Sequence, residues 1–268
     1  MIQEERYNRI MDYLRLEKVA SLKQIADVVK VSVDTVRRDV AYLASKGILE
    51  KVRGGALYND ASRTGPFSVR SIDHREMKRE LATCIRQVLS DGQTVGINGG
   101  TTSVEVAKYL VENYSNLVVI TNSLVVMDII LKAGKFMGIL LGGTVNPEEF
   151  CTYGPVCERE LAQYHIDVSL FAVNSISLDS GITDFRINES GVIKAMHAVS
   201  KKNYVVADSS KFDKTAFMGL MKLSQIDAII TDSQIPPVIL NLFGRAYCSL
   251  SNMLCLLFAQ KRLAKIVQ

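Results

Sequence analysis

Three short loops of glycine, asparagine and small hydroxyl residues have the composition of an anion site. They are residues 98–102 (Asn-Gly-Gly-Thr-Thr), residues 121–123 (Thr-Asn-Ser) and residues 142–144 (Gly-Gly-Thr). Glycine lets the backbone approach a ligand, hydroxyl groups donate hydrogen bonds, and a helix that begins after such a loop favours negative charge at its N-terminus. The alternative is purely structural, because glycine-rich turns between a strand and a helix are frequent.

Each of these loops comes directly after an apolar run of strand length. Loops at the carboxyl ends of parallel strands meet at one edge of a sheet, where α/β proteins usually bind their ligands. This convergence favours an anion site over the structural alternative.

Charged residues further along the chain extend the candidate site. Glu189 and Lys194 lie in a predicted helix, and Lys211 follows a predicted strand, from which a lysine can reach a phosphate as a point charge. A spacing of five is poor for direct pairing on a helix, so the alternative for Glu189 and Lys194 is a surface pair. No metal site is predicted, because the three histidines lack the spacing of metal ligands: His74, His165 and His197.

A second set of side chains, in residues 1–57, is suited to nucleic acid. Arginine makes bidentate contacts to guanine, and hydroxyl groups contact phosphates or bases. In a helix-turn-helix, the second helix enters the major groove and points its N-terminal side chains at base edges. The DNA-contacting residues predicted in this module are Ser21, Ser32, Thr35, Arg37, Arg38, Lys51 and Arg53.

Three helices and a wing are expected to position these side chains. The helices are predicted over residues 4–16, 22–29 and 33–45, with Ser21 and Ser32 as N-caps. In the third helix one buried face is predicted, formed by Val33, Val36, Val40 and Leu43. After Gly47 we expect a two-stranded wing that turns at Gly54 and Gly55. The alternative is a three-helix bundle whose charges are only solvated, but the order of parts favours DNA binding.

The rest of the chain predicts a larger domain. Residues 58–66 read as a linker, and residues 67–243 alternate helical patterns with apolar, β-branched runs. Such runs are typical of strands covered on both faces, which predicts an α/β domain with a mostly parallel sheet. The predicted strands are residues 94–97, 117–121, 136–141, 168–173, 204–207 and 228–231. Residues 244–268 are left unassigned; an extra strand and helix is the simplest interpretation.

Charge and cysteine content narrow the class of protein. The 268 residues carry a net charge of +4, of which +3 falls in residues 1–57, where 11 Lys and Arg face 8 Asp and Glu. The five cysteines form no C-x-x-C pair, which indicates reduced thiols in a cytosolic protein. No signal peptide and no apolar run of membrane-spanning length is present, so we expect a soluble, cytoplasmic protein that does not bind a membrane.

The first 57 residues resemble the winged helix-turn-helix of DeoR-type bacterial transcription regulators. The resemblance rests on VSVDTVRRDVAYL and the closing RGGAL. Val40 stands where the family usually has Leu, and Arg53 stands where it has His. Residues 67–235 are similar to the effector domain of the same family, which is related in fold to ribose-5-phosphate isomerases and CoA transferases.

This resemblance implies a phosphorylated sugar or related intermediate as effector, and no other cofactor. By motif match, the effector-binding residues are Asn98, Gly100, Thr101, Thr102, Asn122, Ser123, Gly143, Glu189, Lys194 and Lys211. Asn98 departs from the family's usual Asp, which puts contacts between that side chain and sugar hydroxyls in doubt.

The leading hypothesis is a regulator that binds double-stranded operator DNA as a homodimer or homotetramer. We expect a repressor of a sugar catabolism or uptake operon, relieved by a small phosphorylated metabolite. One alternative is an activator of the same class, since the sign of regulation depends on where the operator lies. Another alternative is a sugar-phosphate isomerase with an accessory domain, in which Glu189 would be the general base. The DNA-binding module has no role in such a reaction, so we do not expect this protein to be an enzyme.

Overall fold

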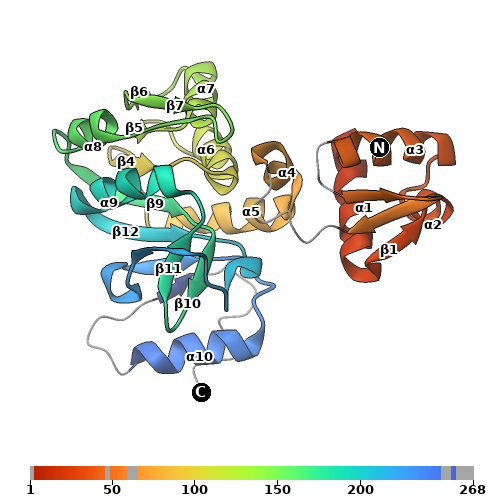
Figure 1. The fold of residues 1–268 in the computed structure, drawn as a ribbon. Coiled ribbons are helices and arrows are strands. Elements are labelled where there is room, and N and C mark those ends of the chain that lie inside the picture. The colour runs from red at the N-terminus through yellow and green to blue at the C-terminus, as the bar shows by residue number, and fades with distance from the viewer. Residues whose placement is uncertain (1–2, 46–48, 59–65, 249–254, 258–268) are drawn as a thin grey trace. The chain divides into compact units, whose positions relative to one another are not determined.

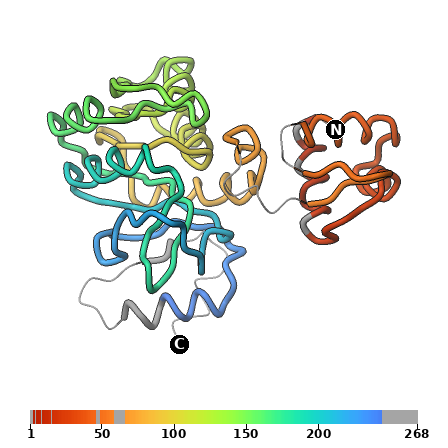
Figure 2. The backbone as a smooth tube through the Cα atoms, viewed as in Figure 1, coloured from red at the N-terminus to blue at the C-terminus, as the bar shows by residue number. Residues whose placement is uncertain are grey.

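The computed structural model describes residues 3–45, 49–58, 66–248 and 255–257. The chain divides into two compact units, Met1–Arg75 and Glu76–Gln268. Figure 1 draws the first unit in red to orange and the second in yellow to blue, and Figure 2 follows the same path as a continuous tube. Each unit has its own hydrophobic core, so each is described by itself.

The first unit combines helices with a small antiparallel sheet. Its elements are α1 (Gln3–Glu17), β1 (Val19–Ser21), α2 (Leu22–Val29), α3 (Val33–Ser45), β2 (Leu49–Val52), β3 (Gly55–Tyr58) and α4 (Phe67–Ile72). The three predicted helices and the two wing strands are confirmed. The wing has a third strand, because β3 pairs with β1 as well as with β2. Three residues are too few to show a periodicity, so β1 left no signal in the sequence.

The core of the first unit lies between its helices and the wing. Val36, Val40 and Leu43 of α3 are fully buried, as predicted, but Val33 is 37% exposed. The prediction for Val33 was therefore wrong: it is the first residue of α3, and its side chain is only partly covered. Val69 of α4 is buried in the same core. The first unit thus extends to Arg75, whereas the larger domain was predicted to begin at residue 67.

The second unit is built from alternating helices and strands. Its helices are α5 (Arg75–Ala82), η2 (Thr83–Gln87), α6 (Thr101–Asn113), α7 (Leu124–Ala133), α8 (Pro155–Leu161), η3 (Ile187–Glu189), α9 (Ser190–Ala198), η4 (Ser209–Lys211), η5 (Leu223–Gln225) and α10 (Pro237–Cys248). Its strands are β4 (Thr94–Ile97), β5 (Val118–Thr121), β6 (Met137–Leu140), β7 (Thr144–Asn146), β8 (Cys151–Tyr153), β9 (Ile166–Ala172), β10 (Ser175–Ser177), β11 (Gly181–Asp184), β12 (Ser200–Val206), β13 (Met218–Met221), β14 (Ala228–Ile230) and β15 (Cys255–Leu257).

A seven-stranded parallel sheet forms the centre of this unit, in the order β15-β14-β12-β9-β4-β5-β6. All six predicted strands are present, so the α/β fold class is confirmed. The chain runs from β4 through β5 to β6 on one side, and then returns to build β9, β12 and β14 on the other. The direction of building therefore reverses between β4 and β9, which are neighbours in the sheet. In the unassigned tail, β15 pairs with β14.

Helices cover both faces of this sheet, which explains the continuously apolar strands. Along β9, Leu170 packs with residues of α5, α6 and α7, whereas the next residue, Phe171, packs with residues of α8 and α9. The same alternation holds for Val206 and Val205 of β12. Successive side chains of a strand point to opposite faces, so both must be apolar when both faces are buried.

Two smaller antiparallel sheets were not predicted. The hairpin β7–β8 follows β6, and β10, β11 and β13 form a separate three-stranded sheet. Their strands are short, and β10 and β11 are buried on both faces, so they lack the alternation of a half-exposed strand. Across the described ranges, no helix is long and apolar enough to cross a membrane.

Buried cysteines of the second unit should react slowly with an alkylating reagent. Cys84, Cys151 and Cys157 are free and buried, and burial raises the pKa of Cys84 and of Cys157 to about 11. At pH 8 such a shift leaves about 100-fold less thiolate than an ordinary thiol has. We expect iodoacetamide to label these three only after denaturation, as measured by peptide mass spectrometry. Rapid labelling of the native chain at any of them would contradict this packing.

Candidate functional site

The candidate site lies between β4 and β9, where the order in which successive strands are added to the large sheet reverses. Ligand sites of open α/β sheets usually occupy this position. Asn98 follows β4 and is fully buried. Its Oδ1 accepts a hydrogen bond from the backbone N of Ala172 at 2.8 Å, and its Nδ2 donates to the carbonyl oxygens of Ala172 and Gly99 at 3.0 Å each. Asn98 therefore joins the ends of β4 and β9. An aspartate has no N–H for the two carbonyls, so the amide suits this position.

Asn122 connects the second loop to the first. Its Oδ1 accepts from the backbone N of Gly99 at 2.9 Å, and its Nδ2 donates to the carbonyl of Thr152 in β8 at 2.8 Å. Ser123, the N-cap of α7, accepts from the backbone N of Val126. The predicted convergence of loops 98–102 and 121–123 is thus confirmed, and the hairpin β7–β8 joins them.

The N-terminus of α6 has the features of an anion site. Gly100, its N-cap, has φ +144°, a conformation that favours glycine, and no side chain caps the helix within the described part of the chain. Thr101, Thr102 and Ser103 in its first turn are all buried. Lys78 of α5 is only 3% exposed, and its Nζ donates to Oγ1 of Thr101 at 3.2 Å. A lysine ammonium beside a helix N-terminus strongly favours a bound anion.

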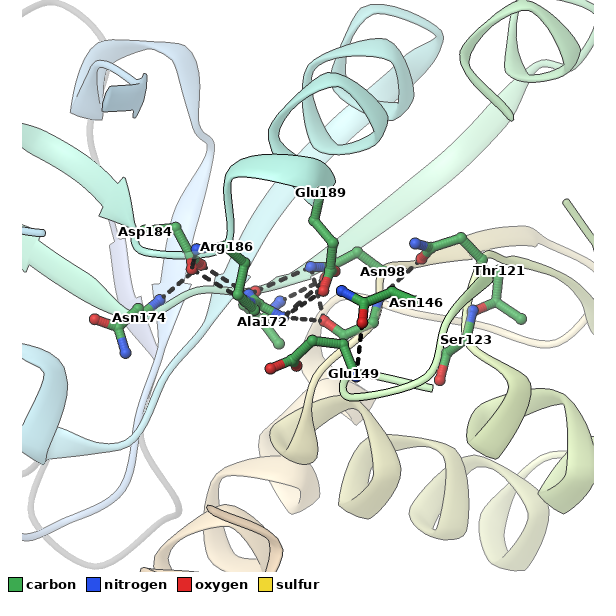
Figure 3. Close-up of polar contacts among 12 residues, drawn as sticks. Asn98, Thr121, Ser123, Asn146, Glu149, Ala172, Asn174, Asp184, Arg186 and Glu189 are labelled. Atoms are coloured by element: carbon green, nitrogen blue, oxygen red, sulfur yellow. Dashed lines mark hydrogen bonds and ion pairs between the residues drawn. The ribbon is translucent and has the colours of Figure 1, made fainter. Parts of the chain in front are cut away.

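The buried side chain of Arg186 connects several segments of the site by hydrogen bonds (Figure 3). Its Nη1 donates to the carbonyl of Gly99 at 2.8 Å, and its Nη2 donates to that of Ala172 at 2.9 Å. Nε and Nη2 bond the two carboxylate oxygens of Asp184 at 3.0 and 2.7 Å. Nη1 also lies 3.4 Å from both carboxylate oxygens of Glu189. Arg186 thus binds the same two carbonyls as Asn98 and adds two carboxylates.

Charges in this cluster influence one another because they are shielded from water. Burial alone would lower the pKa of Arg186, but Asp184 and Glu189 outweigh it and raise that pKa well above its usual value. Burial raises the pKa of Glu189, Arg186 opposes this shift, and Glu149 adds to it. Burial and Glu189, which accepts a hydrogen bond from the thiol, also raise the pKa of Cys151. The cluster therefore holds a permanently charged arginine beside acidic groups.

The structure does not gather every predicted effector residue in this cluster. Gly143 is exposed, and a Cβ there would lie 2.6 Å from the carbonyl oxygen of Tyr153, so the backbone packing explains the glycine. Lys194 is exposed on α9, outside the buried network, whereas Glu189 is buried, so the two do not form the alternative surface pair either. Lys211 is half-buried in η4, at the carboxyl end of β12. The cluster does contain Asn98, Gly100, Asn122 and Glu189.

Four residues of the site were missed in the sequence: Lys78, Glu149, Asp184 and Arg186. Lys78 lies in α5, which precedes the first strand of the large sheet, whereas Asp184 ends β11 and Arg186 lies in the loop after it, where no glycine-rich pattern marks a site. The one signal in the sequence concerned Lys78, because a lysine on the apolar face of a helix is unusual. No group of His, Cys, Asp and Glu suited to a metal occurs in the described residues.

In the first unit, α3 presents its basic face to solvent. Arg37 and Arg38 are exposed, and Thr35 is half-buried. The carboxylate of Asp34 pairs with Arg37, and Nε of Arg38 donates to the carbonyl of Asp34 at 3.4 Å. Both arginines are thus held along the N-terminal half of α3, the part that contacts bases in a helix-turn-helix.

Serine caps and a buried ion pair fix the orientation of these helices. Ser21 forms a capping box with Gln24 at the start of α2, and Ser32 Oγ accepts from the backbone N of Thr35 at 3.2 Å. Arg6 of α1 binds both carboxylate oxygens of Asp39 in α3, at 2.5 and 3.0 Å. Lys51 and Arg53 are exposed on the wing. A rigid α3 beside a basic wing is the arrangement of a DNA-reading module.

These two units together define a class of protein, a DNA-binding transcriptional regulator with a separate sensor domain. The DeoR-like helix-turn-helix domain matches residues 6–62, and the DeoR C terminal sensor domain matches residues 73–233. The chain therefore belongs to the DeoR family.

Curated relatives match along most of their length. The HTH-type transcriptional repressor GlcR of Bacillus subtilis is 31% identical over 251 residues, which are 93% of each chain. The glycerol-3-phosphate regulon repressor of Escherichia coli is 29% identical over 89% of this chain and 94% of that protein. Among solved structures, ribose 5-phosphate isomerase A of Methanocaldococcus jannaschii is similar with a TM-score of 0.38 and 14% identity, over 52% of this chain and 55% of that one.

Proposed function

We propose that this protein is a repressor that leaves its operator when a phosphorylated sugar binds at the N-terminus of α6. The observation that carries the sugar-phosphate part is the buried ammonium of Lys78 beside the uncapped start of α6. Helix N–H groups and a lysine ammonium are common phosphate ligands. Thr101 and Thr102, in the same turn, supply hydroxyl donors.

The remainder of the sugar is proposed to lie towards the carboxylates of the cluster. Glu149 and Glu189 are acceptors that suit sugar hydroxyls, and Asn146 of the same β7–β8 hairpin stands beside them in Figure 3. Asn98 is not proposed as a sugar ligand, because its amide already bonds Ala172 and Gly99. Ser123, Gly143 and Lys211 stay predictions as ligands.

The experiment that tests this function uses a labelled operator and a panel of sugars. We expect a phosphorylated sugar to raise the melting temperature of the chain and to release the operator in fluorescence anisotropy. The unphosphorylated sugar should do neither, because it lacks the anion. A coupling of about 1–3 kcal/mol would change operator affinity about 5- to 150-fold. If no phosphorylated sugar shifts the melting temperature, the effector part of the proposal fails.

On the DNA side, Arg38→Ala should weaken operator binding. Arg38 is exposed on the basic face of α3, and loss of a base contact costs about 1–3 kcal/mol, or about 5- to 150-fold in affinity. Gel-shift titration at fixed salt measures this. Arg9→Ala is the matched control, because Arg9 is an exposed arginine of α1 paired with Glu5. Equal losses in both variants would remove Arg38 from the base-reading surface.

We propose no catalytic role for Glu189, the residue placed best to act as a base. Its carboxylate bonds Arg186 and accepts from the thiol of Cys151. Measurable isomerisation of ribose 5-phosphate, abolished by Glu189→Gln, would contradict this.

A further inference from the structure

We propose that Asp34 is a positioning residue that raises the sequence specificity of DNA binding by orienting Arg37 towards a guanine. The two side chains lie one helical turn apart at the start of α3 (Figure 1), and Nη1 of Arg37 donates to Oδ1 of Asp34. Both side chains are exposed, 72% for the aspartate and 57% for the arginine. The inference rests on operator binding through α3, which is the DNA-binding part of the proposed function.

A carboxylate on this face of α3 has a cost for DNA binding. Asp34 lies three and four residues before Arg37 and Arg38, so the three share one face of the helix, and all are exposed. The phosphate backbone repels a carboxylate, whatever the base sequence. Capping of the helix does not explain the aspartate, because Ser32 already accepts a hydrogen bond from the backbone N of Thr35. The carboxylate of Asp34 bonds the guanidinium of Arg37 instead.

The contact leaves Arg37 able to read a base. Arginine recognises guanine through two hydrogen bonds, to O6 and N7 in the major groove. Among the described residues, the contact with Asp34 uses only Nη1 of Arg37. A guanidinium has five N–H donors, so Nε and Nη2 remain for the two acceptors of the base. Asp34 thus holds the arginine without using the donors that recognition needs.

Restraint of a long side chain favours the correct base. A free arginine loses its rotamer freedom when it binds, whereas a side chain that is already held in place loses less. The backbone carbonyl of Asp34 also accepts a hydrogen bond from Nε of Arg38 at 3.4 Å. One residue therefore restrains both arginines of this face.

The helix that carries these side chains is itself fixed to α1. Arg6 forms an ion pair with Asp39 in which both side chains are largely buried. The ring of Tyr7 stacks on that of Tyr42, with 5.4 Å between the ring centroids. Because α3 cannot easily rotate against α1, the orientation that Asp34 gives to its neighbour is also an orientation relative to the whole DNA-binding unit.

The expected effect of Asp34 is on discrimination between DNA sequences. On the operator, the repulsion between the carboxylate and the phosphates is offset by the oriented arginine. On other DNA nothing offsets it. Removal of the carboxylate should therefore weaken binding to the operator and strengthen binding to unrelated DNA. A role in stability alone would not strengthen binding to any DNA.

The experiment compares the full wild-type chain with Asp34→Ala in the absence of effector. Duplexes that bind the wild type are selected from a random pool, and each base pair of a selected duplex is then substituted in turn. In fluorescence anisotropy, the wild type should lose about 5- to 150-fold in affinity at the G·C pair that Arg37 reads, and Asp34→Ala at least about 5-fold less. On a scrambled duplex, Asp34→Ala should bind roughly two- to fivefold more tightly than the wild type.

Two further variants assign the effect. The double variant Asp34→Ala, Arg37→Ala should discriminate no worse than Arg37→Ala alone, because the side chain that is positioned is already absent. Glu5→Ala is the matched control, since Glu5 forms the same kind of exposed pair with Arg9 on α1 and its loss changes the net charge equally. It should discriminate between duplexes like the wild type. Circular dichroism checks that each variant is folded.

Three results would overturn the inference while leaving the repressor function in place. They are full discrimination by Asp34→Ala, full discrimination by Arg37→Ala, and a further loss of discrimination in the double variant. A wild type that selects no duplex from the pool would overturn the inference together with the repressor function. The two failures are therefore told apart by the wild-type selection.

Discussion

Replacement of Arg186 by Met is expected to destabilise the second unit strongly. The substitution leaves Asp184 and Glu189 as buried carboxylates without their cation, and it removes donors from the carbonyls of Gly99 and Ala172. Breaking a buried ion pair in this way costs about 3–5 kcal/mol. For a domain of this size, each kcal/mol lowers the melting temperature by about 2–4 °C, so we expect a fall of roughly 6–20 °C in calorimetry.

The pH dependence of this loss follows from the same charges. In the variant, the pKa values of Asp184 and Glu189 should rise, because burial remains and the arginine is gone. A carboxyl with a raised folded-state pKa binds more protons in the folded state, so the variant should lose stability as the pH rises through that pKa. The deficit against wild type is therefore expected to be larger at pH 8 than at pH 5.

The double variant Arg186→Met, Asp184→Asn is the control for this interpretation. It removes one of the two stranded carboxylates, so it should recover part of the lost stability. A melting temperature for Arg186→Met within 2–3 °C of wild type, which is on the order of 1 kcal/mol, would contradict the role given to the arginine.

Replacement of Lys78 by Met is expected to abolish the effector response at ordinary effector concentrations. Lys78 is buried beside Thr101 at the start of α6, so the loss removes a charge-assisted hydrogen bond to the proposed phosphate. Such a bond contributes about 1.5–3 kcal/mol, which corresponds to about 10- to 150-fold weaker effector binding. Anisotropy with labelled operator should show unchanged DNA affinity in the absence of effector, because α3 belongs to the other unit.

Two further variants sharpen this test. Thr101→Val with Thr102→Val removes the hydroxyl donors of the same turn and should also prevent effector-induced release. Lys194→Met removes an exposed lysine of α9 that the motif match had assigned to the effector. We expect it to respond like the wild type. A lost response in Lys194→Met with a normal response in Lys78→Met would place the phosphate away from α6.

Much of the fold could be predicted because periodicity is a local property. The apolar spacing and the serine caps determined α2 and α3 to the residue. The parallel strands were visible because strands covered on both faces are apolar throughout. Position 33 shows the limit, since its side chain has the right spacing on α3 but stays 37% exposed at the first residue of the helix. The spacing of residues indicates which of them lie on the same face of a helix. It does not indicate how far along that face a neighbouring element covers them.

The sequence by itself determined the parts of this protein: a basic helix-turn-helix and an α/β domain whose glycine and threonine loops meet at one sheet edge. Only the tertiary structure decided which charges meet there. Lys78 comes from a helix that precedes the sheet, and Arg186 comes from a loop after β11. Asn98, which differs from the family's usual Asp, joins the end of β4 to the end of β9 through its side-chain amide. Contacts between residues far apart in the chain leave no periodic trace in the sequence, because they depend on how strands are ordered in the sheet.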